Sequence, residues 1–384
     1  MEFEFSDEQR QLREAVIGFL GKEFTFDRLR ALKRAGSGRD AALWRGMAEL
    51  GVPAVNVPAA FGGLGYGPAE TLALMDACGP SLLLEPIVSS AVIATALLRE
   101  YAASAPAADL LRALARGERI ATLAHFETES RPHSRYVGTQ ARPADAGWRL
   151  DGGKTVVLHA PVADVLLVSV RTAGTPSDSD GVALFLVPRE TKGVRLEEYL
   201  LVDGQPAADV VLQDVRLRAA DRLGGPGTVL PAIEAAMDIG VAALCAEAVA
   251  IMQALLDATV EYLRTRQQFG QPIGRFQALQ HRVADMLIHL EQARSMSYLV
   301  AQRCTGPDAN ERRRALSAAM VVIGEASRFV GQQAVQLHGG MGMTDELKVS
   351  HWFKRLTAIE AMLGDTDGNV QWYAALTRGG RAAR

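Results

Sequence analysis

The chain has 384 residues, of which 48% are hydrophobic, and its 41 basic and 44 acidic residues give a formal net charge of -3. This length allows roughly two to three domains with a large buried core. Because the charge is nearly balanced, we expect neither nucleic acid nor an anionic membrane surface as a partner. The cysteines Cys78, Cys245 and Cys304 lie far apart and lack CxxC spacing, which favours a reducing cytoplasm over disulfides or a zinc site.

Residues 1–117 form the first predicted domain, which is helical. The N-terminus is acidic and begins a helix rather than a signal peptide, because Ser6 and Gln9 have the spacing of a capping box. Asp40 is placed to cap another helix, which ends at Gly51. Helices are expected over residues 6–24, 41–50, 68–78, 86–101 and 107–116, and the glycine-rich residues 58–65 are expected to form a loop.

Residues 118–225 form the second predicted domain, in which short apolar runs alternate with Gly, Asp and Pro turns. This alternation is typical of an antiparallel barrel or sandwich. The Ser- and Asp-rich stretch 175–180 is expected to be an exposed hairpin loop. Across the whole chain, no apolar run approaches the ~20 residues that span a bilayer. The predicted strands are 120–124, 155–158, 165–170, 182–187 and 209–212.

Residues 226–384 form the third predicted domain, which consists of long helices up to about residue 377 and a disordered tail at 378–384. Their apolar residues predict faces buried on several sides, as in the core of an oligomer. The fold class is therefore α+β: an N-terminal helical domain, a middle β-barrel and a C-terminal bundle of long helices.

Two motifs in the last third carry the functional signal. The first begins at Arg266 and continues through Phe269, Pro272 and Phe276 to Gln280, and the second covers residues 335–342. An arginine at a helix end suits a diphosphate because its planar fork gives bidentate contacts, although a lone arginine more often forms a surface ion pair. Glycine lets backbone N–H groups approach phosphate oxygens. Neither motif follows a strand or carries Gly-Lys-Ser/Thr, so we reject the P-loop and Rossmann interpretations.

Together with the loop at 58–65, these motifs resemble those of the acyl-CoA dehydrogenase family over essentially the whole chain. The resemblance implies the fold of that family, FAD as cofactor, and α,β-dehydrogenation of an acyl-CoA in fatty acid metabolism. It also implies that electrons leave to an electron-transfer flavoprotein. In the family, these motifs reach the FAD of a neighbouring subunit. The cofactor-binding residues that the resemblance implies are Arg266, Phe269, Gln277, Gln336, Gly339 and Gly340.

Within the family, three segments are most similar to the small subunit of pimeloyl-CoA dehydrogenase: residues 244–248, 276–281 and 328–340. This likeness implies a hetero-oligomer with a larger acyl-CoA dehydrogenase subunit. A homo-oligomer is the alternative.

The chain departs from the family pattern where the catalytic base is expected. The family stretch Tyr-Glu-Gly-Thr appears here as residues 363–366, so Gly364 takes the place of the glutamate and Asp365 follows it. Some members carry the glutamate on the first long C-terminal helix, at the position of Gly240. Glu247 lies on the same helix face about 10 Å further along, whereas Asp238 points away.

The middle domain also departs from the pattern that holds the flavin ring. Residues 126–133 replace Thr-Glu-Pro-Gly-x-Gly-Ser-Asp, and residues 156–159 replace Trp-Ile-Thr-Asn, including Val156 for tryptophan and Leu158 for threonine. Four interpretations stay open. The chain shares FAD with a partner subunit, works alone with Asp365 as base, serves as a structural or regulatory subunit without redox activity, or is a flavin monooxygenase on the same fold.

Several polar residues can also be interpreted as structural rather than catalytic or metal-binding. Asp365 is either the base or a residue that caps a turn. Glu247 lies in an apolar helix and needs a partner, so a structural ion pair is favoured over catalysis. His281, Asp285 and His289 share a helix face, but the family uses no metal and we expect none.

Overall fold

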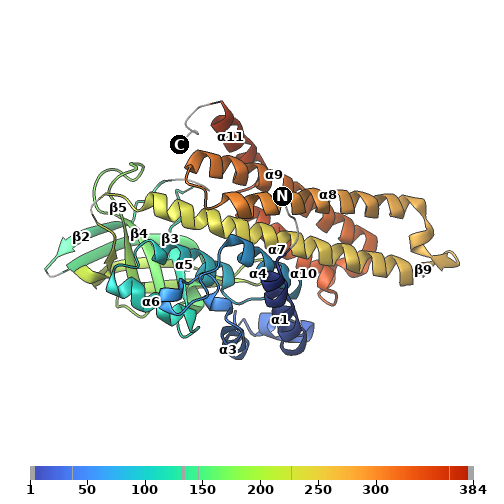
Figure 1. The fold of residues 1–384 in the computed structure, drawn as a ribbon, viewed down its shortest axis with the longest axis horizontal. Coiled ribbons are helices and arrows are strands. Elements are labelled where there is room, and N and C mark those ends of the chain that lie inside the picture. Colours follow the sequence, from blue (N-terminus) through green and yellow to red (C-terminus); the bar gives the residue numbers. More distant parts are fainter. Residues whose placement is uncertain are drawn as a thin grey trace. The chain divides into compact units, whose positions relative to one another are not determined.

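The computed structural model describes residues 5–36, 38–130, 135–145, 147–225, 227–362 and 364–378. Within these limits the chain folds as two compact units (Figure 1). The helical unit comprises residues 1–29, 68–83 and 241–383, and the sheet unit comprises residues 30–67 and 84–240. The helices of the first 117 residues are thus divided between the two units. The domain limits 1–117, 118–225 and 226–384 stay a prediction, and most of the predicted disordered tail lies outside the described residues.

The helical unit contains the long helices expected for the C-terminal region, together with two helices from the N-terminal region. Figure 1 shows α7 and α8 side by side, with a short hairpin joining their far ends. The elements of this unit are α1 (Asp7–Glu23), α4 (Pro68–Cys78), α7 (Leu230–Thr265, from Val241 onward), β9 (Gln267–Gln268), β10 (Gln271–Pro272), α8 (Gln277–Arg303), α9 (Ala309–His338), α10 (Lys348–Met362) and α11 (Thr366–Thr377).

Local side chains explain where several helices begin. Ser6 accepts a hydrogen bond from the backbone of Gln9, and the Gln9 side chain accepts one from the backbone of Ser6, so the predicted capping box of α1 is confirmed. Asp308 caps α9 by accepting hydrogen bonds from the N–H groups of Asn310 and Glu311. These contacts satisfy N–H groups that have no partner inside the helix.

Helix α7 corrects one expectation drawn from the sequence. Among the described residues, it is the one helix long and apolar enough to cross a membrane, with a mean hydropathy of 2.0 over its most apolar window. Its sequence is rich in alanine and carries few charges. Its apolar residues do not form one uninterrupted run, so the sequence analysis did not identify it as a possible membrane-spanning helix. However, 78% of that window is buried within the protein, which is the behaviour of a helix packed in a core.

A buried ion pair crosses the interior of the helical unit. The Arg355 guanidinium on α10 donates two hydrogen bonds to the Glu247 carboxylate on α7, each 2.7 Å long. Both side chains are 7% exposed. The expected ion pair of Glu247 is therefore confirmed.

All three cysteines are buried and none of them forms a disulfide within the described residues. Burial, followed by the charge of Glu247, raises the pKa of the Cys78 thiol.

The sheet unit consists of helices packed against a mostly antiparallel sheet. Its hydrogen-bonded strand order is β6-β7-β3-β2-β4-β5-β8, while β1 pairs in parallel with β4. The strands are β1 (Ala121–Ala124), β2 (Gln140–Ala144), β3 (Gly147–Leu158), β4 (Val165–Arg171), β5 (Val182–Pro188), β6 (Val194–Leu200), β7 (Pro206–Arg218) and β8 (Arg222–Leu223). The helices are α2 (Phe26–Ala35, from Arg30 onward), α3 (Ala41–Glu49), η4 (Ile87–Ala94), α5 (Thr95–Arg99), α6 (Ala105–Ala115) and the first residues of α7.

The core of the sheet unit joins these layers. Leu97 and Leu111 from the helices, Leu167 and Leu184 from the sheet, and Ile233 from α7 belong to one buried apolar cluster. The predicted α+β fold with helical, β and helical regions is confirmed. The expected helix over 86–101 contains a π-helix, η4, before α5, and the sequence analysis did not predict α2, β2 or β6.

The Glu247–Arg355 pair generates a stability prediction. Arg355→Met is expected to lower the free energy of unfolding by about 3–5 kcal/mol, because it leaves the Glu247 carboxylate buried without its partner. Changing both residues to leucine is expected to restore most of that loss. The matched control is Arg195→Met in the exposed Arg195–Glu197 pair, which is expected to cost under about 1 kcal/mol. Urea unfolding measures all four proteins, and equal losses for the two arginine variants would contradict the prediction.

Candidate functional site

Two aromatic side chains bring the two C-terminal motifs together. The rings of Tyr262 on α7 and His338 on α9 stack with centroids 4.5 Å apart. Tyr262 lies four residues before Arg266, and His338 lies between Gln336 and Gly339. The structure therefore places the predicted arginine motif and the predicted glycine motif at one end of the helical unit.

His338 supports this junction as a neutral ring. Its Nδ1–H donates a 2.8 Å hydrogen bond to the carbonyl oxygen of Ala334, one turn earlier in α9. Burial lowers the pKa of His338, outweighing the opposing effect of that hydrogen bond. A neutral imidazole stacked on tyrosine needs no counter-ion, so the junction stays intact without a nearby carboxylate.

The hairpin between α7 and α8 projects its side chains outward. The backbone of Ile273 donates a 2.9 Å hydrogen bond to the Arg266 carbonyl and closes the hairpin. Phe269 is 89% exposed, has φ of +53°, and meets Phe276 edge to face. Arg266 and Gln277 are exposed, and within the described residues their side chains have no hydrogen-bond or ion-pair partner. A large aromatic ring so exposed is typical of a contact surface.

The end of α9 supplies an open stretch of backbone. Gly339 has φ of +60°, and a Cβ built on either Gly339 or Gly340 would meet no atom within 4 Å. Gln336 is exposed next to them, again with no side-chain partner in the described part of the chain. The unused Arg266 guanidinium and Gln336 amide suit an anion such as a diphosphate, and the two glycines allow it to come close to the backbone.

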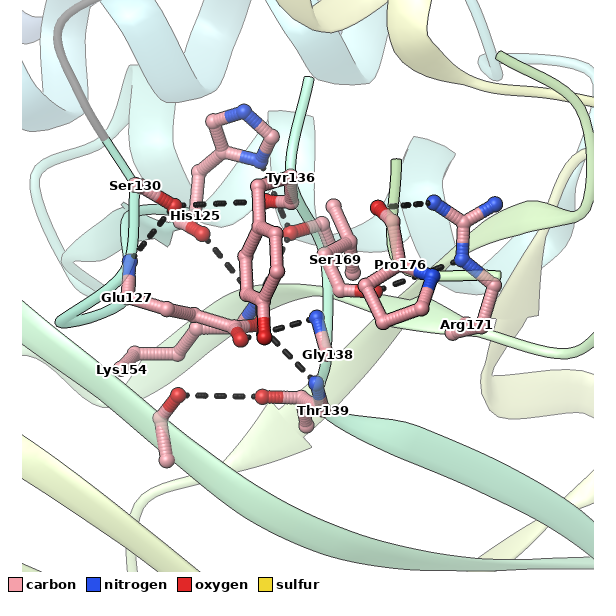
Figure 2. Close-up of polar contacts among 12 residues, drawn as sticks. His125, Glu127, Ser130, Tyr136, Gly138, Thr139, Lys154, Ser169, Arg171 and Pro176 are labelled. Atoms are coloured by element: carbon pink, nitrogen blue, oxygen red, sulfur yellow. Dashed lines mark hydrogen bonds and ion pairs between the residues drawn. The ribbon is translucent and has the colours of Figure 1, made fainter. Parts of the chain in front are cut away.

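In the sheet unit, a buried polar network organises the segment that begins at Phe126. Figure 2 shows the Glu127 carboxylate between Lys154 and the backbone of Gly138 and Thr139. Lys154 Nζ donates to Glu127 Oε1 over 2.6 Å and also contacts Ser169 Oγ at 3.1 Å. Gly138 and Thr139 donate their N–H groups to the same carboxylate over 2.8 and 3.0 Å. The network fixes residue 127 next to residues 138 and 139; residues 131–134 lie outside the described part.

The charges of this network depend on one another. Burial lowers the pKa of Lys154 to about 8, although the Glu127 carboxylate opposes this effect. Burial also raises the pKa of Glu127, but the Lys154 charge and the hydrogen bonds from Lys154 and Thr139 outweigh it, so the pKa lies below its ordinary value. His125, whose Nδ1 lies 2.9 Å from Ser169 Oγ, has its pKa lowered to about 3, first by burial and then by Lys154. The sequence analysis missed Lys154, and a lysine inside an apolar strand was the available signal.

Residues 156–159 offer little polar surface. Val156 has φ of +50°, and its N–H donates to Asp209 Oδ1 over 2.9 Å. His159 is buried, with Nδ1 2.9 Å from Ser89 Oγ and Nε2 3.2 Å from the Leu84 carbonyl oxygen. Both ring nitrogens of His159 are therefore used within the protein, and Leu158 has no polar side-chain atom to offer a ligand.

The positions considered for a catalytic base are filled by structural contacts. Asp365 is exposed and caps α11, because its Oδ1 accepts a 2.6 Å hydrogen bond from the Gly368 N–H. Gly364 is buried with φ of +85°. At Gly240, a Cβ would lie 2.5 Å from Ile93 Cγ1, so the space for a larger side chain is occupied. The structure shows Asp365 as a cap, and its role as a base stays a prediction.

No metal centre is formed by the residues that the structure describes, since they include no group of three or more His, Cys, Asp or Glu side chains suited to an ion. The ring of His289, from the helical triplet with His281 and Asp285, lies against Phe329 with centroids 4.3 Å apart.

The two motifs and the α-β-α order define a class of flavin-dependent oxidoreductases. Sequence models of the acyl-CoA dehydrogenase N-terminal, middle and C-terminal domains match residues 6–118, 126–215 and 230–373. The chain belongs to the acyl-CoA dehydrogenase family, whose members bind FAD.

Relatives of this chain span nearly its whole length. The L-prolyl-[peptidyl-carrier protein] dehydrogenase of Pseudomonas fluorescens is 32% identical over 339 residues, which cover 86% of each protein. A chain of the ChsE4–ChsE5 complex from Mycobacterium tuberculosis is 27% identical with a TM-score of 0.86, and all of both chains is covered. The FAD complex of PigA is 26% identical with a TM-score of 0.86, with 99% of each chain covered.

The chain's residues fit FAD unevenly. The side chains of Arg266 and Gln336 fit the diphosphate because they are exposed and have no partner among the described residues, and Gly339 and Gly340 leave room for it to approach the backbone. Residues 156–159 offer no free side-chain donor to a flavin ring. The fit is therefore good at the diphosphate end of the cofactor and poor at its ring end.

The Glu127–Lys154 pair predicts a dependence of stability on pH. The pKa of Glu127 in the folded state lies below its ordinary value of 4.5. Its stabilising contribution is therefore fully present above pH 4.5 and is lost as the pH falls through the folded-state pKa. Glu127→Gln is expected to lower the free energy of unfolding by about 3–5 kcal/mol at pH 7. In the variant, the free energy of unfolding is also expected to decrease less between pH 4.5 and 3 than in the wild type. Glu198→Gln, at an exposed position, is the control, and an identical pH profile in both variants would refute the assignment.

Asp365→Asn separates the capping role from the catalytic one. Asparagine caps helices about as well as aspartate but cannot take a proton as a carboxylate does. If Asp365 only caps α11, the purified holoenzyme is expected to keep its dehydrogenase rate within about twofold and to unfold at the same temperature. A fall of about 100-fold or more in kcat at unchanged stability would instead make Asp365 the base.

Proposed function

We propose that this chain is the smaller subunit of a hetero-oligomeric, FAD-dependent acyl-CoA dehydrogenase and that it supplies the diphosphate-binding part of a shared flavin site. A larger acyl-CoA dehydrogenase subunit supplies the ring-binding part and the catalytic base. The observation that carries the proposal is the contrast between the unused side-chain donors of Arg266 and Gln336 and the occupied positions at His159, Gly240 and Asp365.

The exposed hairpin supports an interface with another chain. Phe269 is 89% exposed at its tip, with Arg266 and Gln277 beside it. In a lone subunit these side chains stay in solvent and make no binding contacts. In a complex with a partner that carries a flavin, all of them contribute to binding. The likeness to a chain of the two-component ChsE4–ChsE5 complex supports the same arrangement, as does the likeness to the pimeloyl-CoA dehydrogenase small subunit.

The chemistry divides between the two chains. When bound, FAD accepts the hydride that leaves the β-carbon of the acyl thioester. This chain's Arg266 and the backbone at Gly339 and Gly340 neutralise and orient the diphosphate. Proton removal from the α-carbon needs a carboxylate, and this chain has glycine at both family positions, Gly364 and Gly240. The base is therefore assigned to the partner, and the electrons to an electron-transfer flavoprotein.

The thioester carrier is a second question that one relative raises. The P. fluorescens relative is named for a prolyl group on a peptidyl carrier protein rather than on CoA. If the complex turns over a panel of acyl-CoA substrates, that result would support CoA as the carrier. Activity with the same acyl groups only on a carrier protein would replace acyl-CoA with a protein-bound thioester.

Two other functions remain candidates on the same fold. A regulatory subunit without redox activity leaves the partner's FAD content and rate unchanged when it is omitted. A flavin monooxygenase does not react with acyl-CoA and consumes oxygen when a reductase supplies reduced flavin. The cytoplasm is the proposed location for all of them.

Arg266→Ala tests the shared site directly. The variant is co-expressed with the larger subunit, and FAD absorbance per complex is measured. Losing a charged, bidentate contact is expected to weaken FAD binding about 10- to 100-fold without changing the unfolding temperature of the flavin-free protein. Arg264→Ala, at an exposed position in the last turn of α7, is the matched control and is expected to keep its flavin.

The same preparation decides whether the chain works alone. The shared-site proposal expects a colourless lone protein and a yellow, active complex. Near-stoichiometric FAD in the lone protein, bleached by an acyl-CoA, would overturn it in favour of a self-sufficient enzyme.

A further inference from the structure

A cavity lies within the helical unit, among α1, α4, α7 and α8. Its volume is about 330 Å³, which lies at the small end of the range for ligand sites. The nearest part of its wall on α7, Gln253, lies about 20 Å along the helix axis from Arg266. The cavity is therefore separate from the end of α7 that carries the flavin motif.

The floor of the cavity is apolar and tightly held. Leu72 from α4, with Ala246 and Val249 from α7, contributes buried aliphatic surface. Phe5 and Tyr298 stand beside it with ring centroids 6.3 Å apart. A ligand that enters this space exchanges water contact for hydrocarbon and aromatic contact, which favours an apolar body.

The rim of the cavity carries charged groups whose hydrogen-bonding capacity is only partly used. Arg13 Nε pairs with Asp76 Oδ2, and the other two Arg13 nitrogens have no partner among the described residues. Arg294 donates through Nη2 to Gln253 and through Nε to Glu291, and its Nη1 has no partner there. The Gln253 amide is also engaged, since its Nε2 donates to Asp257 and its Oε1 accepts from Arg294. The lining thus keeps three guanidinium nitrogens free against one free carboxylate oxygen, Asp76 Oδ1.

A hydroxyl also lines this space. Ser297 is 3% exposed as a whole residue, and within the described residues its Oγ has no hydrogen-bond partner. Ser297 is therefore available to donate a hydrogen bond to an oxygen atom inside the cavity, either of water or of a ligand.

We infer that this cavity binds a small organic carboxylate, with its carboxylate on Arg13, Arg294 and Ser297 and its apolar part on Leu72, Ala246 and Val249. Each guanidinium is already paired with one carboxylate, Arg13 with Asp76 and Arg294 with Glu291, so the preference for an anion rests on the guanidinium N–H groups that these pairs leave unused. The volume admits a ligand the size of butyrate or benzoate. An inorganic anion leaves the apolar floor in contact with water, so a carboxylate with a hydrocarbon part fits better than phosphate.

The test measures binding to the full-length chain by thermal unfolding and by titration calorimetry. Butyrate, benzoate and inorganic phosphate are the probes. Benzoate or butyrate is expected to raise the unfolding temperature in a saturable manner, by about 2–5 °C at 100-fold excess over Kd. Phosphate at the same concentration is expected to give less than half of that shift.

Two variants tie the binding to this cavity. Arg294→Gln is expected to weaken carboxylate binding about 10-fold or more, and Ala246→Leu is expected to abolish it by filling the floor while every charge stays in place. Arg303→Gln, at an exposed position on the same helix, is the matched control and keeps wild-type binding.

Three results would overturn the inference. The first is that neither carboxylate has a saturable effect, which would mean that water alone fills the cavity. The second is a thermal shift that Ala246→Leu leaves unchanged. The third is binding of phosphate without binding of a carboxylate. Ala246→Leu retains both arginines, so the test stands even if Arg294→Gln fails to fold. The result is independent of FAD, and the inference is therefore separable from the proposed function.

Discussion

The stack of Tyr262 on His338 is the contact on which the arrangement of the two C-terminal motifs depends. It joins α7 to α9 at the point where each helix ends, so the two motifs that follow these residues share one surface. Because His338 is buried and neutral, the junction is held by ring packing and one backbone hydrogen bond, and it needs no external charge. The exposed donors beyond it are consequently pre-positioned before any cofactor or partner arrives.

The contrast between the C-terminal motifs and the middle-region segments at 126–133 and 156–159 follows from where polar groups are already used. The side-chain donors of Arg266 and Gln336 have no partner among the described residues, and exposure to water keeps them solvated at little cost. In the sheet unit, the polar side chains are turned inward and satisfy one another, as Lys154 and Glu127 do. A protein segment whose polar groups are internally paired is stable but has little to offer a ligand.

The sequence predicted the fold well because its signals were local. The Ser6 and Gln9 capping box, the Asp40 cap of α3 and the long helical periodicity after residue 230 each depend on neighbours within a few residues. It failed at β6, whose charged residues reflect its position at the edge of the sheet, and at the π-helix η4, whose backbone pattern depends on tertiary packing. The site was only partly predictable. The motif residues were recognisable, but the partners of Glu247 and Glu127 lie 108 and 27 residues away in sequence, and only the folded chain brings them together.

The packing of Ile93 against Gly240 has a consequence for how this chain could change over generations. A glutamate at position 240 would collide with Ile93 unless that side chain became smaller first, and a smaller residue at 93 alone opens a hole in a buried helix. A glutamate at position 364 would have to adopt the backbone conformation now taken by a glycine with φ of +85°. Each route to a glutamate at either position therefore passes through a less stable intermediate, and the two glycines are hard to replace one substitution at a time.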